Sequence, residues 1–262
     1  MSHQTAAKEI ECTGSNGSVT IRAESLPFSE IPGQSKLFLE YQKDPESLKR
    51  YYPNAVASHV QITERIPEVL ANYKADREVL CDALTETNKK FGATHETLDN
   101  IELLRDAETV AVVTGQQAGL FSGPLYTIYK ALSAIRMVEC LRGRGVKAVP
   151  VFWVATEDHD FEEVSKTTFI GKKGNVVDVK NEPKRCYEDL PVGYIKLDDS
   201  IDETIEELFR EITPTEFTAD LKSLVLASWT PGEYFGDSFG VLLTRLLGKY
   251  GLIVLCPLNN SF

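Results

Sequence analysis

Two short polar segments of the sequence carry the side chains best suited to chemistry. The first runs from Thr114 to Pro124 and reads Thr-Gly-Gln-Gln-Ala-Gly-Leu-Phe-Ser-Gly-Pro. Glycines let a ligand approach the backbone closely, and glutamine amides donate and accept hydrogen bonds without carrying charge. The glycine spacing is neither G-x-G-x-x-G nor G-x-x-x-x-G-K-[ST], so neither a dinucleotide site nor a P-loop is predicted.

This loop and the residues after it form a candidate substrate-binding site. Tyr126 and Lys130 share a helix face by their i, i+4 spacing, and the free amides at a helix start favour an anion. The alternatives are a turn that only connects two elements, and a lysine that extends from a mostly buried helix into water. The candidates are Gly115, Gln116, Gln117, Gly119, Ser122, Gly123, Tyr126 and Lys130.

The second segment reads Thr-Glu-Asp-His-Asp, from Thr156 to Asp160. Neighbouring carboxylates favour the charged form of an imidazole, so we predict His159 as the proton-transfer residue, with Asp158 and Asp160 as catalytic partners. Glu157 joins the substrate-binding candidates. No metal site is expected, because consecutive ligands on one loop rarely close a coordination shell. The alternative is an acidic loop that only caps a helix beginning near Phe161.

Both segments follow predicted buried strands, at 109–114 and 148–155. Between the strands, a helix is predicted from Pro124 to Leu141, with Gly123 as its N-cap and Gly143 and Gly145 at its end. Strand, helix and strand form one βαβ unit of a doubly wound sheet. Ligands bind at the carboxyl ends of such strands, so the two segments should meet there.

The rest of the chain is predicted to be mainly helical before this unit and mixed after it. Residues 1–20 are expected to be flexible, and 21–106 to form a helical N-terminal region. A core spans 107–262, with an insertion around 165–230. The elements predicted within it are a hairpin of 167–170 and 176–179, capping boxes at Ser200/Glu203, Thr213/Glu216 and Thr230/Glu233, a helix over 237–249, and a third buried strand at 252–255.

Composition points to a reduced, cytoplasmic protein. The net charge is −11, so nucleic acid and anionic membranes are not expected as partners. The N-terminus lacks a secretory signal, and the uncharged stretch 109–129 contains Gln116, Gln117 and a Gly-Pro pair, unlike a membrane span. Five scattered cysteines are typical of free thiols: Cys12, Cys81, Cys140, Cys186 and Cys256.

The runs TGQQAGLFSGPLYTIYKALSAI and VPVFWVATEDHDFEEV resemble the signature of the bacillithiol-biosynthesis cysteine-adding enzymes, the BshC family. The resemblance implies a Rossmann-like core with inserted segments, incomplete at its C-terminus here because family chains run beyond Phe262. It also implies a C-terminal coiled coil, absent here, through which the full-length proteins form homodimers. The implied reaction is the last step of bacillithiol synthesis, which joins the carboxyl group of cysteine to the sugar amine of glucosaminyl-malate.

Amide formation from a free carboxylate is uphill in water, so we expect ATP as a co-substrate that activates the carboxyl, and no tightly bound cofactor. The expected partners are small molecules, cysteine and glucosaminyl-malate. Two other functions stay open. A nucleotidyltransferase-like enzyme would share this layout, although it would usually carry H-x-G-H where this chain has Ser-Gly-Pro-Leu. A ligand-binding fragment without activity is the other.

Overall fold

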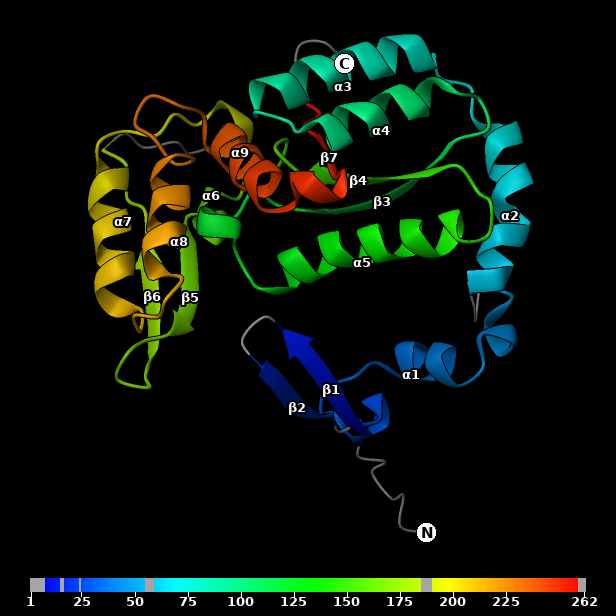
Figure 1. Ribbon diagram of the computed structural model, residues 1–262, viewed down its shortest axis with the longest axis horizontal. Helices are drawn as coiled ribbons and strands as arrows, with labels where there is room; N and C mark the ends of the chain where they lie inside the picture. The colour runs from blue at the N-terminus through cyan, green and yellow to red at the C-terminus, as the bar shows by residue number, and fades with distance from the viewer. Residues whose placement is uncertain (1–7, 15–16, 24, 55–58, 185–189, 259–262) are drawn as a thin grey trace. The chain divides into compact units, whose positions relative to one another are not determined.

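The computed structural model describes residues 8–14, 17–23, 25–54, 59–184 and 190–258 (Figure 1). The chain divides into two compact units, residues 1–62 and residues 63–262. The boundary therefore lies before the expected one at 106/107, because two helices of the predicted N-terminal region pack on the sheet. All candidate site residues lie in the second unit.

The first unit begins with an antiparallel hairpin that the sequence analysis did not predict. In its register Lys8 pairs with Ala23 and Gly14 with Gly17. Residues 1–7 and 15–16 of the segment expected to be flexible lie outside the described residues. The signal for the hairpin is a short two-residue alternation, with Ile10 opposite Ile21. The unit's elements are β1 (Lys8–Gly14), β2 (Gly17–Ala23), η1 (Phe28–Glu30), α1 (Lys36–Lys43), η2 (Pro45–Leu48) and the start of α2 (His59–Asn72).

The second unit is built on a three-stranded parallel sheet in the order β3-β4-β7. Its strands are β3 (Val110–Gln116), β4 (Ala148–Val154) and β7 (Ile253–Leu255). Val110 pairs with Ala148 and Gln116 with Val154, so β3 and β4 end at the same edge. Helix α5 (Tyr126–Arg142) connects them. The predicted α/β class and Rossmann-like parallel sheet are confirmed.

Helices cover both faces of this sheet, as a doubly wound fold requires (Figure 1). Alternate residues of β4 point to opposite faces. Val149 and Val151 pack with α3 (Arg77–Lys90) and α4 (His95–Arg105). Phe152 and Val154 belong to the other core, with α5 and α9 (Phe235–Leu247). Gly92 and Gly143 follow the C-terminal ends of α3 and α5, and Gly251 ends the 3-10 helix η5 (Gly248–Tyr250) that follows α9.

Side chains of α3 and α4 hold the outer edge of β7. Asn88 donates from Nδ2 to the carbonyl of Val254 at 2.8 Å and accepts the amide of Val254 at Oδ1 at 2.9 Å. Thr97 Oγ1 donates to the carbonyl of Leu252 at 3.1 Å. Asn88 thus takes the place of a neighbouring strand, so the backbone groups of Val254 are paired on the side away from β4.

The segment between β4 and α9 contains the predicted hairpin and, among the described residues, three α-helices. Its elements are α6 (Phe161–Val164), β5 (Lys166–Ile170), β6 (Val176–Lys180), η4 (Val192–Tyr194), α7 (Ser200–Glu211) and α8 (Thr218–Leu226). The helix start predicted at Ser200 is confirmed, but none of the three predicted capping boxes caps a helix. Asp198 accepts the amide of Ser200 at the start of α7. Helix α8 begins at Thr218, later than the capping box at Thr213 predicted. Helix α9 begins at Phe235, after the predicted capping box at Thr230 and two residues before the helix predicted over 237–249.

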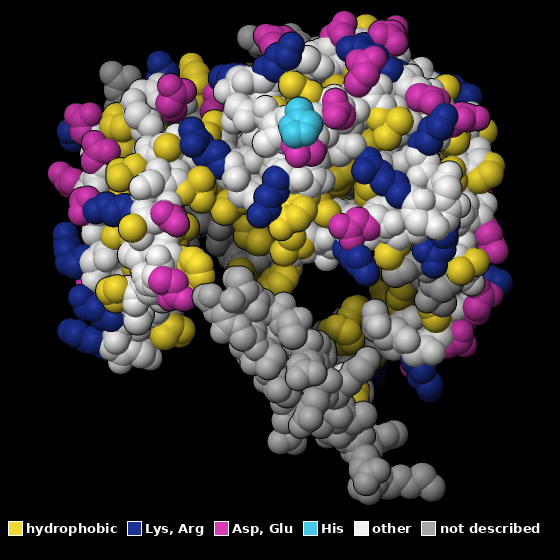
Figure 2. Space-filling view, viewed as in Figure 1, with side chains coloured by type: hydrophobic (Ala, Val, Ile, Leu, Met, Phe, Trp, Pro, Cys, Tyr) yellow, Lys and Arg dark blue, Asp and Glu magenta, His cyan; other side chains and the backbone are white. Residues whose placement is uncertain are grey.

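Acidic and basic side chains are interspersed over the second unit on the face shown in Figure 2. The excess of 11 negative charges is therefore not gathered in one place on that face. Within the described ranges, no helix combines the length and apolarity needed to cross a membrane.

Candidate functional site

The glycine-rich segment begins inside a strand, not after it. Gly115 and Gln116 are the last residues of β3, paired with Trp153 and Val154. A Cβ on Gly115 would lie 2.7 Å from the carbonyl oxygen of Trp153. Gly115 therefore allows β3 to lie close to β4. The loop itself starts at Gln117.

The loop has a constrained backbone anchored by apolar side chains. Leu120 is fully buried, and the ring of Phe121 packs edge-on against Trp229 with centroids 5.5 Å apart. Phe121 and Ser122 have positive φ angles of 52° and 84°, and Gly123 has φ 63° and ψ −148°. A run of such conformations costs free energy and is typical of functional loops.

Gly119 and Gly123 depend on each other, since a Cβ on Gly119 would lie 2.6 Å from Cα of Gly123. The predicted N-cap role of Gly123 is wrong, because α5 begins at Tyr126 with Leu125 at the N-cap position. The amide of Thr127 bonds to the carbonyl of Pro124, and that of Gly123 to Leu120. These two amides are thus already used within the loop.

We expect Gly123→Ala to lower the free energy of unfolding by about 2–5 kcal/mol. Its backbone conformation costs a non-glycine residue about 1–3 kcal/mol, and crowding against Gly119 adds a further ~1–2 kcal/mol. Gly174→Ala is the control, since Gly174 also has positive φ but no neighbour within 4 Å of an added Cβ. Urea unfolding should show a loss of only about 1–2 kcal/mol there. Equal losses at both positions would show that the contact with Gly119 has no effect.

The two glutamines form the centre of a hydrogen-bond network across the sheet edge. Gln116 Nε2 donates to Gln117 Oε1 at 2.9 Å and to Tyr126 Oη at 3.1 Å. Gln117 Nε2 donates to Asp158 Oδ2 at 3.1 Å and to Glu163 Oε2 at 3.3 Å. The two polar segments therefore meet, as the strand arrangement predicted.

Lys130, on α5, donates hydrogen bonds to this network. Its ammonium group donates to Gln116 Oε1 at 2.8 Å and to the carbonyl of Gly115 at 3.2 Å. It also lies 5.3 Å from the ring centroid of Tyr126. These contacts fix the orientation of the Gln116 amide, so Lys130 acts in this structure as a positioning residue.

The residues of the acidic segment make different contacts and have different roles. Asp160 accepts the amide of Glu163 at 2.9 Å and caps α6, as the alternative interpretation predicted. Glu157 accepts the indole N–H of Trp153 at 3.2 Å. The side chain of His159 is exposed. Only Asp158 among the three predicted catalytic residues contacts the glutamine network.

The amide of Gln117 lowers the pKa of Asp158, with help from the backbone amide of Asp160 and against the opposing effect of burial. This carboxyl is therefore ionised near neutral pH. A depressed pKa means that its stabilising contribution is complete above the unfolded pKa, about 3.9, and is lost as the pH falls through the folded pKa.

We therefore expect the melting temperature of the protein to fall more steeply below about pH 4 than that of the Asp158→Asn variant. Near neutral pH the variant should itself be less stable, because it loses the ionised acceptor for Gln117. Melting curves recorded from pH 7 to pH 3 provide the measurement. Parallel curves for the two proteins over this range would rule out a contribution from Asp158.

A cavity of about 200 Å³ lies beside this network. Of the predicted residues, five line it, and Gly115, Ser122, Lys130, Glu157 and the three predicted catalytic residues do not. Asp158 reaches it only through Gln117. The full lining is Gln116, Gln117, Gly119, Gly123, Pro124, Tyr126, Glu163, Val164, Lys166, Thr167 and Thr168.

The charged residues of this cavity, Glu163 and Lys166, were missed by sequence reasoning. The ammonium group of Lys166 has no hydrogen bond or ion pair within the described part of the chain. The sequence placed the hairpin start at Thr167, but did not show that the hairpin turns back onto the glycine-rich loop. The signal available in the sequence was a lysine six residues after Asp160, next to the predicted start of the hairpin.

Other potential chemistry is sparse in the described ranges. Cys81, Cys140 and Cys256 are free thiols, and the side chains of Cys12 and Cys186 lie outside the described residues. The described side chains include no group of three or more His, Cys, Asp or Glu arranged to hold a metal ion.

Comparison with known proteins gives one consistent family. Residues 21–262 match the model of the family described as Bacillithiol biosynthesis BshC, N-terminal Rossmann-like domain. A Salinibacter ruber protein named "Putative cysteine ligase BshC" is 37% identical over 236 residues, covering 90% of this chain and 43% of its own length.

Two further proteins of the same name agree. That of Chlorobaculum tepidum is 33% identical over 88% of this chain and 42% of its own length. That of Bacillus cytotoxicus is 35% identical over 89% and 42%. The chain thus spans about two fifths of the length of these curated relatives. It belongs to the BshC family, of which it corresponds to the N-terminal Rossmann-like domain.

Proposed function

We propose that the cavity beside the glutamine network binds cysteine for a cysteine ligase. The observation that carries the proposal is the pair of opposite charges on its wall, Glu163 and the unpaired Lys166. An amino-acid zwitterion needs a cation for its carboxylate and an anion for its ammonium group, both in hydrogen-bonding reach. Pockets for drug-sized ligands have volumes of roughly 300–1,000 Å³, so about 200 Å³ suits a ligand as small as an amino acid.

The remaining lining residues complete this assignment. Gln116 and Gln117 present amides whose orientation is fixed by Tyr126, Lys130 and Asp158. Because both protons of each Nε2 are already donated within the network, each glutamine offers a ligand the remaining lone pair of its Oε1, an acceptor suited to an ammonium group. These acceptors are held in place before the ligand binds. Pro124 and Val164 supply apolar surface for a thiol-bearing side chain.

The reaction we propose joins the carboxyl group of cysteine to the sugar amine of glucosaminyl-malate. The names of the relatives support a ligase, and the family description supports bacillithiol biosynthesis. We retain ATP as the proposed co-substrate because the carboxyl must be activated before an amine attacks it. The cavity is too small for a whole nucleotide and its loop lacks phosphate-binding spacing, so we assign cysteine to it, and not ATP.

Proton transfer by His159 remains a prediction. Its exposed side chain is not among the lining residues of the cavity. Asp158 is ionised and holds the Gln117 amide in place, so it is poorly suited to donate a proton.

The proposed function is tested by assaying this chain and the full-length protein with cysteine, glucosaminyl-malate and ATP. Mass spectrometry of the sugar product and separation of AMP from ADP are the readouts. The full-length protein should form the amide, and this chain should at least bind cysteine. A full-length protein that forms no amide from these three compounds would refute the proposed ligase.

A further inference from the structure

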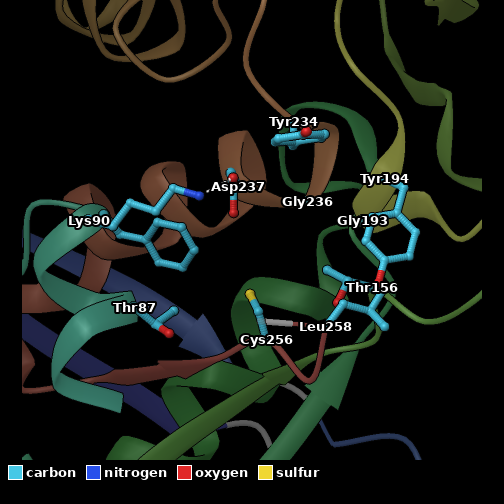
Figure 3. Close-up of a pocket in the computed structure, with 11 residues that line it drawn as sticks. Thr87, Lys90, Thr156, Gly193, Tyr194, Tyr234, Gly236, Asp237, Cys256 and Leu258 are labelled. Carbon is cyan, nitrogen blue, oxygen red and sulfur yellow. Dashed lines mark hydrogen bonds and ion pairs between the residues drawn. The ribbon is translucent and has the colours of Figure 1, made fainter. Parts of the chain in front are cut away.

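A second cavity of about 200 Å³ lies at the same sheet edge, beyond the ends of β4 and β7. It shares no lining residue with the cavity proposed for cysteine. Figure 3 shows Lys90 and Asp237 facing each other on one side of it, and Thr156 and Tyr194 on the other. An inference about this cavity does not depend on the proposed function of the first.

Thr156 provides a polar group without a partner in this cavity. Its side chain is 3% exposed, and its hydroxyl has no hydrogen bond within the described part of the chain. A buried hydroxyl without a partner destabilises the folded protein. A ligand that accepts a hydrogen bond from this hydroxyl would remove the destabilisation.

Two glycines bring backbone close to this threonine. A Cβ on Gly236 would lie 2.6 Å from Cγ2 of Thr156, and one on Gly193 would lie 3.0 Å from its Cβ. The carbonyl of Thr156 also accepts the amide of Gly193 at 2.9 Å. Thr156 is therefore held against the first turn of α9.

The start of α9 supplies further donors. No side chain caps this helix of 13 residues. The amide of Phe235 bonds to the carbonyl of Ile195, and that of Ser238 to Tyr234. Among the described residues, the amides of Gly236 and Asp237 have no acceptor. The positive end of the helix dipole lies at these amides.

The charged groups around the cavity favour a ligand with one negative charge. Lys90 Nζ lies 2.5 Å from Asp237 Oδ2, so this carboxylate is already neutralised. Burial raises the pKa of Cys256 to about 12, with Asp237 and Glu157 adding to the effect and Lys90 opposing it. The thiol is therefore neutral. A helix end is equivalent to roughly half a unit charge, which matches a monoanion better than a dianion.

We propose that this second cavity binds the carboxylate group of a small ligand, with the amides of Gly236 and Asp237 and the hydroxyl of Thr156 as donors. The test is an NMR titration of the ¹⁵N-labelled chain with acetate and, separately, with inorganic phosphate at constant ionic strength. Acetate should give saturable shifts of the Gly236 and Asp237 amides, and phosphate should bind more weakly.

Thr156→Val replaces the hydroxyl by a methyl group of similar size, and should weaken acetate binding about tenfold or more. Its melting temperature should equal or exceed that of the parent, since an unpaired buried hydroxyl is lost. Thr109→Val is the matched control, because Thr109 is also buried with an unpartnered hydroxyl but lies before the opposite end of β3. It should leave acetate binding unchanged.

Four outcomes would overturn the proposal. Acetate shifts at these amides that do not saturate, or equal affinities for acetate in Thr156→Val and the parent, would remove the site. A lower melting temperature for Thr156→Val than for Thr109→Val would show that the hydroxyl serves the fold. Tighter binding of phosphate than of acetate would overturn the assignment to a carboxylate.

Discussion

Replacing Lys166 by methionine is expected to raise the Kd for cysteine by about 10- to 100-fold. A hydrogen bond to a charged group contributes about 1.5–3 kcal/mol, and each 1.4 kcal/mol corresponds to a factor of ten in affinity. The ammonium group of Lys166 forms no ion pair with a carboxylate within the described part of the chain, so it is available to the ligand. Equilibrium binding of labelled cysteine to the chain provides the measurement.

Two controls separate this effect from a general change in charge. Lys173→Met removes a lysine from the exposed turn of the same hairpin, outside the cavity lining, and should change the Kd less than about twofold. Cysteamine lacks the carboxylate of cysteine, so it should bind the Lys166→Met variant and the parent equally. Equal Kd values for cysteine in the Lys166→Met and Lys173→Met variants would contradict the assignment of the carboxylate to Lys166.

The largest loss of stability is expected from Asn88→Ala. Asn88 is fully buried and pairs with both the amide and the carbonyl of Val254. Alanine leaves both backbone groups without partners, at about 1–3 kcal/mol each. The free energy of unfolding should therefore fall by about 2–6 kcal/mol, measured by urea denaturation.

Asn175→Ala is the matched control, because Asn175 lies exposed in the β5–β6 turn. Its effect should stay within about 0.5 kcal/mol. A loss below about 1 kcal/mol for Asn88→Ala would mean that water or a shifted side chain satisfies Val254, and that β7 does not depend on α3 for its outer edge.

Much of the fold could be predicted because the sequence patterns that indicate each element lie within that element. The β-branched runs at 109–114 and 148–155 indicated buried parallel strands, and the intervening helix ends at Arg142, just before the predicted stop at Gly143. The hairpin at β5 and β6 was found within one residue at each end. The capping boxes failed because Thr-Pro turns such as Thr213-Pro214 satisfy the same pattern without starting a helix. The role of Asn88 depends on a contact 166 positions away, which no local pattern contains.

The candidate site was predicted in part for the same reason. Gln116, Gln117 and Asp158 were brought together by one rule, that parallel strands end at a common edge. Lys130 was expected to bind an anion, but its helix directs it to Gln116 Oε1. Lys166 enters the site because the hairpin folds back onto the loop, a tertiary contact that composition and periodicity do not encode.

The central claim is that the cavity beside Gln116 and Gln117 binds cysteine between Glu163 and Lys166. The most direct measurement is an experimental structure of the protein crystallised with cysteine. We expect a carboxylate oxygen of cysteine within ~3.2 Å of Lys166 Nζ and its ammonium nitrogen within a similar distance of a Glu163 carboxylate oxygen. Cysteine bound elsewhere on the protein, with Glu163 and Lys166 contacting only solvent, would contradict the claim.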